Sequence, residues 1–336
     1  MQKLFKGVLT WLFAILFGFL IVNICCFFYE RPVGWYDTEH GASRALWNPG
    51  TYLIHGQEGY SITKIDRYGY TNEDKPLDDS YILVMGSSHT QGKEVYVDKR
   101  YTTLLNRELA DGTDRLTVFN IANDGHFLPS LIKHFKAALT AYPDATIVVL
   151  EIGSTDYPVD EIERSYDQVE FNPAETAKAF QTFSSFQKAK LIIKEYLPLV
   201  NLIKKQISTA KDAHRLVDEY QVDASAYKDA IDRDLSLIRS EYDGNIVFLY
   251  HPNMTLLPDG TLKLNYSLTW DAFAQACRNN RIDVIDMGPV FEEAYLDSYQ
   301  LPMGFSNTLP GEGHLNTIGH QLAAKALADY VEAKEK

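Results

Sequence analysis

Short apolar runs alternate with stretches of helical periodicity along most of the chain. The runs cover residues 81–85, 116–120, 146–150, 245–250 and 282–285. An unbroken apolar run of this length is typical of a strand buried on both faces. Apolar residues at helical spacing follow at 101–109, 131–142, 227–242, 269–279 and 318–333. The alternation predicts a three-layer α/β fold, with a parallel five-stranded sheet in flavodoxin-like order and helices on both faces.

Two regions depart from this rhythm. Residues 29–60 are rich in Gly, Trp, Tyr and His without a clear period, and we interpret 29–75 as a spacer and lead-in to a domain at 76–336. Residues 160–225 carry apolar side chains three and four apart, among them Phe180, Phe183 and Phe186. This spacing predicts a helical insertion beside the active-site edge of the sheet. It would either shape a substrate pocket, or only cover the sheet or contact a partner.

The N-terminus carries a candidate membrane anchor. Residues 8–28 contain no charged side chain, and this run is long enough to cross a bilayer as one helix. Lys3 and Lys6 precede the run, which places residues 1–28 as a cytoplasmic tip and transmembrane helix, with the rest extracytoplasmic. A cleaved signal peptide is the alternative, but no small-x-small site precedes Tyr29. We therefore expect a single-pass protein of the cell membrane.

Composition excludes some classes of partner and fold. A hydrophobic content of 46% supports a sizeable core, and a net charge of −13 argues against a nucleic-acid partner. Cys277 is the one cysteine outside the apolar segment, so the remainder of the chain cannot form an internal disulfide. The histidines share no metal-ligand spacing, and we expect neither metal nor cofactor.

Candidate chemistry lies at the end of the first apolar run and near the C-terminus. Gly86-Ser87-Ser88-His89-Thr90 places serines at a strand-to-helix turn, and Glu312-Gly313-His314 supplies an imidazole with a carboxylate two residues away. Serine is a weak nucleophile until a neighbouring base takes its proton, and the base needs a partner to fix its tautomer. Ser88, His314 and Glu312 are thus candidates for nucleophile, general base and orienting acid.

These blocks resemble the SGNH (GDSL-like) hydrolases, specifically the membrane-anchored bacterial type. The Gly-Asp-Ser block of that family matches 86–90, with Ser87 for Asp and Ser88 as nucleophile. Its glycine block matches Gly125, its Gly-x-Asn-Asp block matches 153–156 with Thr155 for Asn, and its Asp-x-His block matches 312–314 with Glu312 for Asp. Asp66 to Asn72 also resembles the lead-in of the anchored members.

The resemblance implies an extracytoplasmic serine esterase or acyltransferase. Its oxyanion hole would consist of the Ser88 and Gly125 N–H groups with help from Thr155. The substrate would be an acylated carbohydrate or small ester, with acetyl groups of a surface glycan as the expected target. A membrane O-acyltransferase is the partner that the anchored type suggests.

Two other interpretations remain at this point. The substitutions at Ser87, Thr155 and Glu312 are compatible with a catalytically weak or inactive domain that binds glycan or acts as a scaffold for an O-acyltransferase. An α/β-hydrolase would also place serine at an elbow, but its Gly-x-Ser-x-Gly motif is not met because Thr90 stands at the last glycine.

Overall fold

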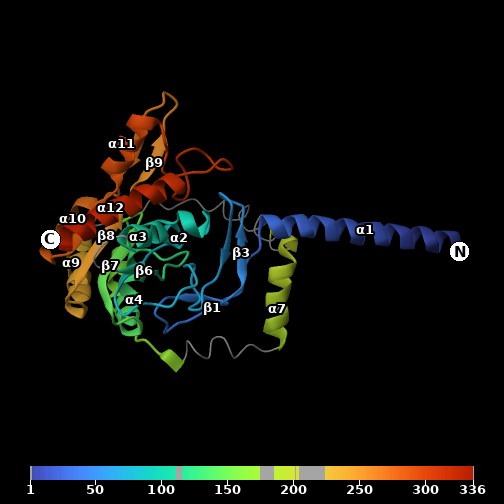
Figure 1. Cartoon of the computed structure of the whole chain (residues 1–336), viewed down its shortest axis with the longest axis horizontal. Coiled ribbons are helices and arrows are strands. Elements are labelled where there is room, and N and C mark those ends of the chain that lie inside the picture. The colour runs from blue at the N-terminus through green and yellow to red at the C-terminus, as the bar shows by residue number, and fades with distance from the viewer. Residues whose placement is uncertain (1, 111–115, 175–184, 201, 204–223, 336) are drawn as a thin grey trace.

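The computed structural model describes residues 2–110, 116–174, 185–200, 202–203 and 224–335. Its centre is a parallel sheet in the order β11-β8-β7-β5-β6 (Figure 1). The strands are β5 (Tyr81–Met85), β6 (Thr117–Asn120), β7 (Ala145–Ile152), β8 (Asn245–Tyr250) and β11 (Asp283–Asp286). Numbered along the chain this is the order 2-1-3-4-5, so the predicted flavodoxin-like sheet is confirmed.

Helices cover both faces of the sheet because successive residues of each strand point to opposite sides. Leu83 of β5 packs into one cluster, whereas Ile82 and Val84 pack into the other. The first face is covered by α4 (Leu128–Ala141), α5 (Val159–Ser165), α9 (Ala224–Glu241) and α10 (Trp270–Asn279). The second is covered by α3 (Tyr101–Ala110), α11 (Gly288–Ser298) and α12 (Thr317–Glu335). The five predicted helical stretches lie within one to three residues of α3, α4, α9, α10 and α12.

Residues 29–75 form two small antiparallel hairpins. The first consists of β1 (Trp35–Asp37) and β2 (Ala45–Trp47), and the second of β3 (Tyr52–His55) and β4 (Ser61–Lys64). Another hairpin, β9 (Asn253–Leu256) with β10 (Leu262–Asn265), follows β8, and the short helix η1 (Val97–Lys99) precedes α3. The loop between β3 and β4 reaches the C-terminal part of the chain, where Gly59 N–H donates to Asn307 Oδ1 at 2.9 Å. These residues therefore contribute to the site described below.

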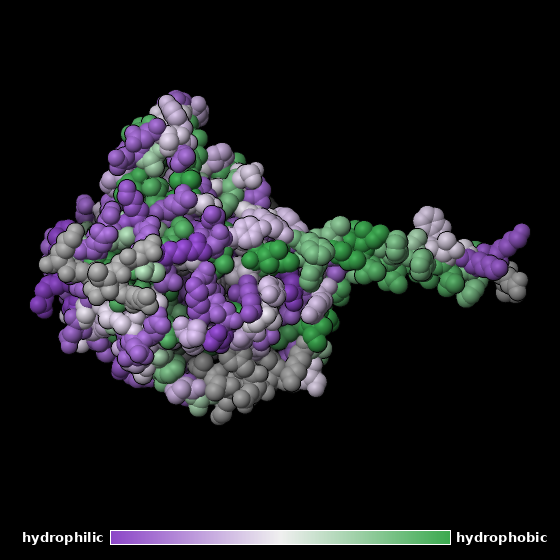
Figure 2. Space-filling view, viewed as in Figure 1, coloured by the Kyte–Doolittle hydropathy of each residue, from purple (hydrophilic) through white to green (hydrophobic). Residues whose placement is uncertain are grey.

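The first helix, α1 (Gln2–Tyr29), extends away from the rest of the molecule (Figure 1). Its surface is hydrophobic along most of its length (Figure 2), with a mean hydropathy of 2.5 over its most apolar stretch. It is the one helix among the described residues that is long and apolar enough to cross a membrane. A signal sequence has the same length and composition, so this finding agrees with both interpretations of residues 8–28.

The described part of the predicted insertion contains α7 (Ser185–Tyr196), which lies crosswise to α1 (Figure 1). Asn23 Nδ2 of α1 donates to Tyr196 O at 2.8 Å, and the rings of Phe27 and Tyr196 stack at 6.2 Å. Phe186 and Ile192 of α7 remain exposed. Phe180 and Phe183 lie outside the described residues. Helix α7 thus packs on the end of α1, whereas α5, which lies at the start of the predicted insertion, packs on the sheet.

Candidate active site

A sharp turn after β5 presents Ser88. The N-cap of α2 (Ser88–Gln91) is Ser87, whose Oγ accepts the His89 N–H at 3.2 Å. Ser88 is the first residue of this helix, a position at which the backbone N–H has no intrahelical acceptor. The turn requires glycine at 86, because a Cβ there would lie 2.6 Å from Glu151 Oε2. The serine block predicted from sequence is therefore placed at the carboxyl end of β5.

A buried carboxylate, Glu151, fixes the turn from beneath. Its Oε2 accepts the Ser87 N–H at 2.7 Å and the Thr90 hydroxyl at 2.8 Å, and its Oε1 lies 2.6 Å from His251 Nε2. Burial opposes ionisation, but the His251 hydrogen bond and charge outweigh it and lower the pKa of Glu151 to about 2. The side chain is fully buried, so the turn is held by an ionised group inside the protein.

His314 lies beside Ser88, with its imidazole between a hydroxyl and a carboxylate. Its Nε2 is 2.8 Å from Ser88 Oγ, and its Nδ1 is 2.6 Å from Glu58 Oε2. The second oxygen of Glu58 accepts the His314 backbone N–H at 2.6 Å. The carboxylate of Glu58 therefore holds both the ring and the backbone of His314.

The orienting acid is where the structure departs from the sequence prediction. Glu312 is exposed, and no hydrogen bond or ion pair joins its carboxylate to His314 among the described residues. Glu58 of the β3–β4 loop occupies the place expected for it. Gly313, at φ +89°, permits this arrangement because a Cβ there would collide with Glu58 Oε1. The chain thus turns Glu312 towards solvent and His314 towards Glu58.

A second carboxyl group, Glu94, lies behind the pair. Its Oε1 is 3.8 Å from His314 Nδ1 and 3.9 Å from His55 Nε2, and burial raises its pKa. Burial opposes the charged form of His314, but the Glu58 hydrogen bond and the charges of Glu94 and Glu58 raise the pKa of His314. Burial likewise opposes ionisation of Glu58, yet the bonds from His314 lower its pKa. The site stabilises the imidazolium that forms when His314 accepts a proton.

A neutral imidazole separates the two carboxylate systems. The His89 ring lies 4.3 Å from the His251 ring and 4.8 Å from the His314 ring, centroid to centroid. Burial and the neighbouring His251 lower the pKa of His89 well below its usual value. Its Nδ1 accepts the Leu315 N–H at 3.2 Å, as a neutral ring can, and this bond fixes the loop that carries His314.

The predicted oxyanion groups fall into two sets. Gly125 has φ +78° with open space around it, and the next residue, His126, lines a cavity of about 190 Å³ together with Ser88 and Ser154. Thr155 is not part of that cavity: its side chain is fully buried and its hydroxyl lies 2.9 Å from Thr269 Oγ1. The predicted help from Thr155 is therefore not supported, because Ser154 faces the cavity in its place.

Sequence reasoning missed four groups at this site: Glu58, Glu94, Glu151 and His251. Glu58 stands in Gly56-Gln57-Glu58-Gly59, where closely spaced glycines indicate a turn but nothing indicates its partner. Glu151 ends an apolar run, and a carboxylate there signals a paired or functional charge. Among the described residues, no group of three or more His, Cys, Asp or Glu side chains could hold a metal ion.

Comparison with known proteins finds similarity among solved structures alone, since no protein-family model and no curated protein matches the sequence. An α/β-hydrolase enzyme from the metagenome of Lake Arreo, Spain, is 16% identical with a TM-score of 0.42, covering 76% of this chain and 97% of its own. An acetyl xylan esterase is 13% identical with a TM-score of 0.42, covering 74% and 99%. The lipase/acylhydrolase from Enterococcus faecalis is 12% identical with a TM-score of 0.41, covering 76% and 96%. At this level of similarity, the functional inference depends on the site itself.

Proposed function

We propose that the protein is a serine esterase or acyltransferase with Ser88 as nucleophile, His314 as general base and Glu58 as orienting acid. The observation that carries the proposal is the continuous contact from Ser88 Oγ through His314 to Glu58, at 2.8 Å and 2.6 Å. A serine hydroxyl, an imidazole and a carboxylate in this order form an activated nucleophile whatever the fold. The blocks that resemble the SGNH hydrolases support the same assignment.

In the first half of the reaction, Ser88 Oγ attacks the ester carbonyl carbon while its proton passes to His314 Nε2. The N–H groups of Ser88 and Gly125 would stabilise the developing oxyanion. Collapse of the tetrahedral intermediate breaks the bond to the alkoxy group, which takes the proton from His314. An acyl-serine remains. Water completes hydrolysis, or an acceptor hydroxyl completes transfer, with His314 again taking the incoming proton.

We further propose that the substrate is a cell-surface glycan that carries ester-linked acyl groups, acetyl in the simplest case. The supporting feature is α1, whose residues 8–28 would anchor the protein in the membrane and place the site on the extracytoplasmic side. Detection of the full-length chain in membrane pellets after carbonate washing is expected. A processed form that begins near Tyr29 in the culture medium would contradict the anchor.

The alternative is an inactive domain that binds glycan or serves as a scaffold for a membrane O-acyltransferase. The hydrogen-bonded Ser88, His314 and Glu58 favour catalysis, because a scaffold has no need of this arrangement. The O-acyltransferase partner stays compatible with the transferase branch of the proposal, in which the acyl-serine passes its group to an acceptor.

The test is hydrolysis of p-nitrophenyl acetate by the full chain in lipid discs, with labelling by a fluorophosphonate followed by intact mass. Ser88→Ala and His314→Ala should each lower kcat by about 10³-fold or more, and the double variant little further, because the residues act as one unit. Ser298→Ala, which changes an exposed serine of α11, is the matched control. Full activity in Ser88→Ala, or no labelling of Ser88 in the wild type, would remove the proposal.

A further inference from the structure

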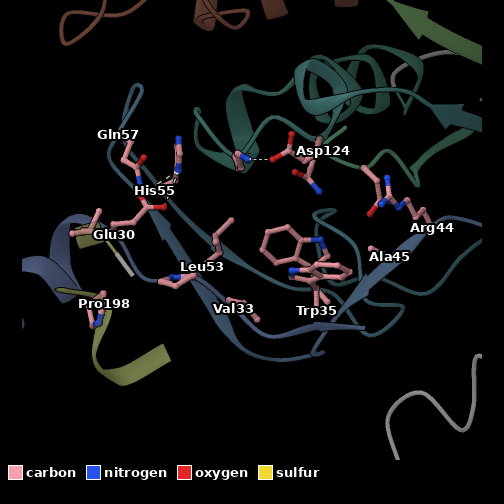
Figure 3. Close-up of a pocket in the computed structure, with 16 residues that line it drawn as sticks. Glu30, Val33, Trp35, Arg44, Ala45, Leu53, His55, Gln57, Asp124 and Pro198 are labelled. Carbon is pink, nitrogen blue, oxygen red and sulfur yellow. Dashed lines mark hydrogen bonds and ion pairs between the residues drawn. The ribbon is translucent and has the colours of Figure 1, made fainter. Parts of the chain in front are cut away.

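A cavity that is separate from the Ser88 cavity lies beside the active site. Its volume is about 490 Å³, within the range of ligand pockets. The β1–β2 hairpin, the β3–β4 hairpin, the loop at 123–124 and the segment after α7 contribute its lining (Figure 3). Glu30, directly after α1, stands at one end of it.

The cavity has an apolar wall and a polar wall. Val33, Trp35 and Leu53 lie together on one side in Figure 3, whereas Gln57, His55 and Asp124 lie on the other. Trp35 and Trp47 are directly opposite each other on paired strands, so their side chains share one face of the hairpin. Trp35 is 44% exposed, although tryptophan side chains are on average highly buried.

One residue of the lining carries an unpartnered acceptor. Gln91 lines the cavity and is 1% exposed, yet its Oε1 has no hydrogen-bond partner among the described residues. A buried amide oxygen without a donor costs free energy, so a ligand that donates a hydrogen bond would be favoured there. This observation is independent of the two tryptophans.

The charges of the cavity are largely balanced within the protein. Lys93 is paired with Asp124, and Glu30 accepts the Gly56 N–H at 3.0 Å and lies 3.3 Å from His55 Nδ1. Arg44 adds one exposed cation at the edge. A polyanion would need a more basic site, and an acyl chain would leave the polar wall unpaired. The lining suits a neutral molecule with one apolar face and several hydroxyl groups.

We propose that this cavity binds a neutral sugar unit of the glycan substrate, with its C–H face on Trp35 and Trp47 and a hydroxyl donating to Gln91 Oε1. The inference rests on the proposed esterase function, and it names where the polymer is held. Three lining residues connect the cavity to the catalytic groups: Gln57 precedes Glu58, Gln91 ends the helix that Ser88 begins, and Asp124 precedes Gly125. A sugar bound here would lie away from the acylated unit of the polymer and would hold that unit in position at Ser88.

Tryptophan fluorescence tests the binding directly. The chain has four tryptophans, so the variant Trp11→Phe/Trp270→Phe keeps only the two that line the cavity. The full chain in lipid discs would be titrated with mannohexaose, xylohexaose, cellohexaose and chitohexaose. We expect a saturable emission change with at least one of them, with a Kd between about 10 µM and 1 mM.

Substitutions then locate the site. In the native-tryptophan background, calorimetry should show that Trp35→Ala or Gln91→Leu weakens binding of that oligosaccharide by about tenfold or more. Leu296→Ala, which changes an exposed residue of α11, is the control for a distant surface change. If none of the four oligosaccharides changes the emission up to about 10 mM, or if Trp35→Ala binds as tightly as wild type, the proposal is wrong. Saturable binding of inorganic phosphate or of a decanoyl chain in place of the sugars would also overturn it.

A kinetic comparison separates this inference from the esterase proposal. With the partly acetylated form of the oligosaccharide that binds, Trp35→Ala should raise KM about tenfold more than it does with p-nitrophenyl acetate. Equal changes on both substrates would overturn the positioning role. Binding needs no working nucleophile, so saturable binding by a chain without esterase activity would refute the esterase and retain the sugar site. Esterase activity without sugar binding would retain the esterase and refute the sugar site.

Discussion

Two carboxylates hold the proposed catalytic groups, and they belong to regions of different construction. Glu151 lies on the central strand β7, fully buried, and receives hydrogen bonds from groups on both sides of the Ser88 turn. Glu58 lies in a loop between two short strands, partly exposed, and binds His314 256 residues away along the chain. The sheet therefore fixes the turn of Ser88, whereas an N-terminal hairpin fixes His314. Loss of Glu151 should damage the fold first, and loss of Glu58 should damage the chemistry first.

Among the variants that compare the two carboxylates, the largest effect is expected for Glu58→Gln. An amide in place of the carboxylate can donate to His314 Nδ1, which favours the wrong tautomer and no longer stabilises the imidazolium. The kcat for p-nitrophenyl acetate should fall by about 10³–10⁴-fold, or about 4–5 kcal/mol in the barrier. Circular dichroism should stay close to wild type, and the free energy of unfolding should fall less than in Glu151→Gln. A loss of less than about tenfold would show that Glu58 is not the orienting acid.

Glu151→Gln should act mainly on stability. The amide removes the buried charge that pairs with His251, and its NH₂ group faces the donors Ser87 and Thr90. We expect a decrease of about 2–4 kcal/mol in the free energy of unfolding, measured by urea denaturation in detergent. Glu293→Gln, an exposed change on α11, is the matched control. An unchanged midpoint for Glu151→Gln would mean that the turn does not depend on this carboxylate.

The pH profile should report the coupling between His314 and Glu58, whose pKa values are shifted in opposite directions. Since the pKa of His314 is raised, kcat/KM should rise with pH along a limb whose midpoint lies above the ordinary value of about 6.5, and Glu58→Gln should move that midpoint down. The raised pKa of His314 stabilises the fold below about pH 6.5 and this contribution is lost as pH rises through the folded value. The lowered pKa of Glu58 stabilises it above about pH 4.3 and is lost on acidification. A midpoint that Glu58→Gln leaves unmoved would contradict the coupling.

The smallest effect is expected for Glu312→Gln. Its side chain is exposed and has no hydrogen bond to His314, so kcat should change by less than about twofold, as is usual for substitutions on the surface. This variant is also the matched control for Glu58→Gln, since each substitution removes one negative charge near His314. Glu312 is near it in sequence, and Glu58 is in contact with it. A loss comparable to that of Glu58→Gln would restore Glu312 as the orienting acid.

The parts that sequence predicted well are those set by local pattern. Strands β5 and β8 coincide with their apolar runs, because burial on both faces leaves a continuous hydrophobic signal. The contact between Glu58 and His314 has no such signal, because it depends on a loop geometry and on Gly313 at positive φ. Thr155 was misplaced for a related reason: which of two adjacent residues faces a cavity is decided by the turn that follows β7. Long-range side-chain pairing was therefore the part that pattern could not supply.

The hairpin that carries Glu58 is also bonded to the end of α1. Glu30 accepts the Gly56 N–H at 3.0 Å, and the Tyr60 hydroxyl donates to Phe28 O at 3.0 Å. These bonds join the hairpin of Glu58, the proposed orienting acid, to the helix that would hold the protein in a bilayer. A protease that cut the chain between α1 and β1 would remove those supports from the Glu58 loop. Release from the membrane and loss of reactivity would then be one event, which would confine ester chemistry to the envelope and keep shed fragments inert.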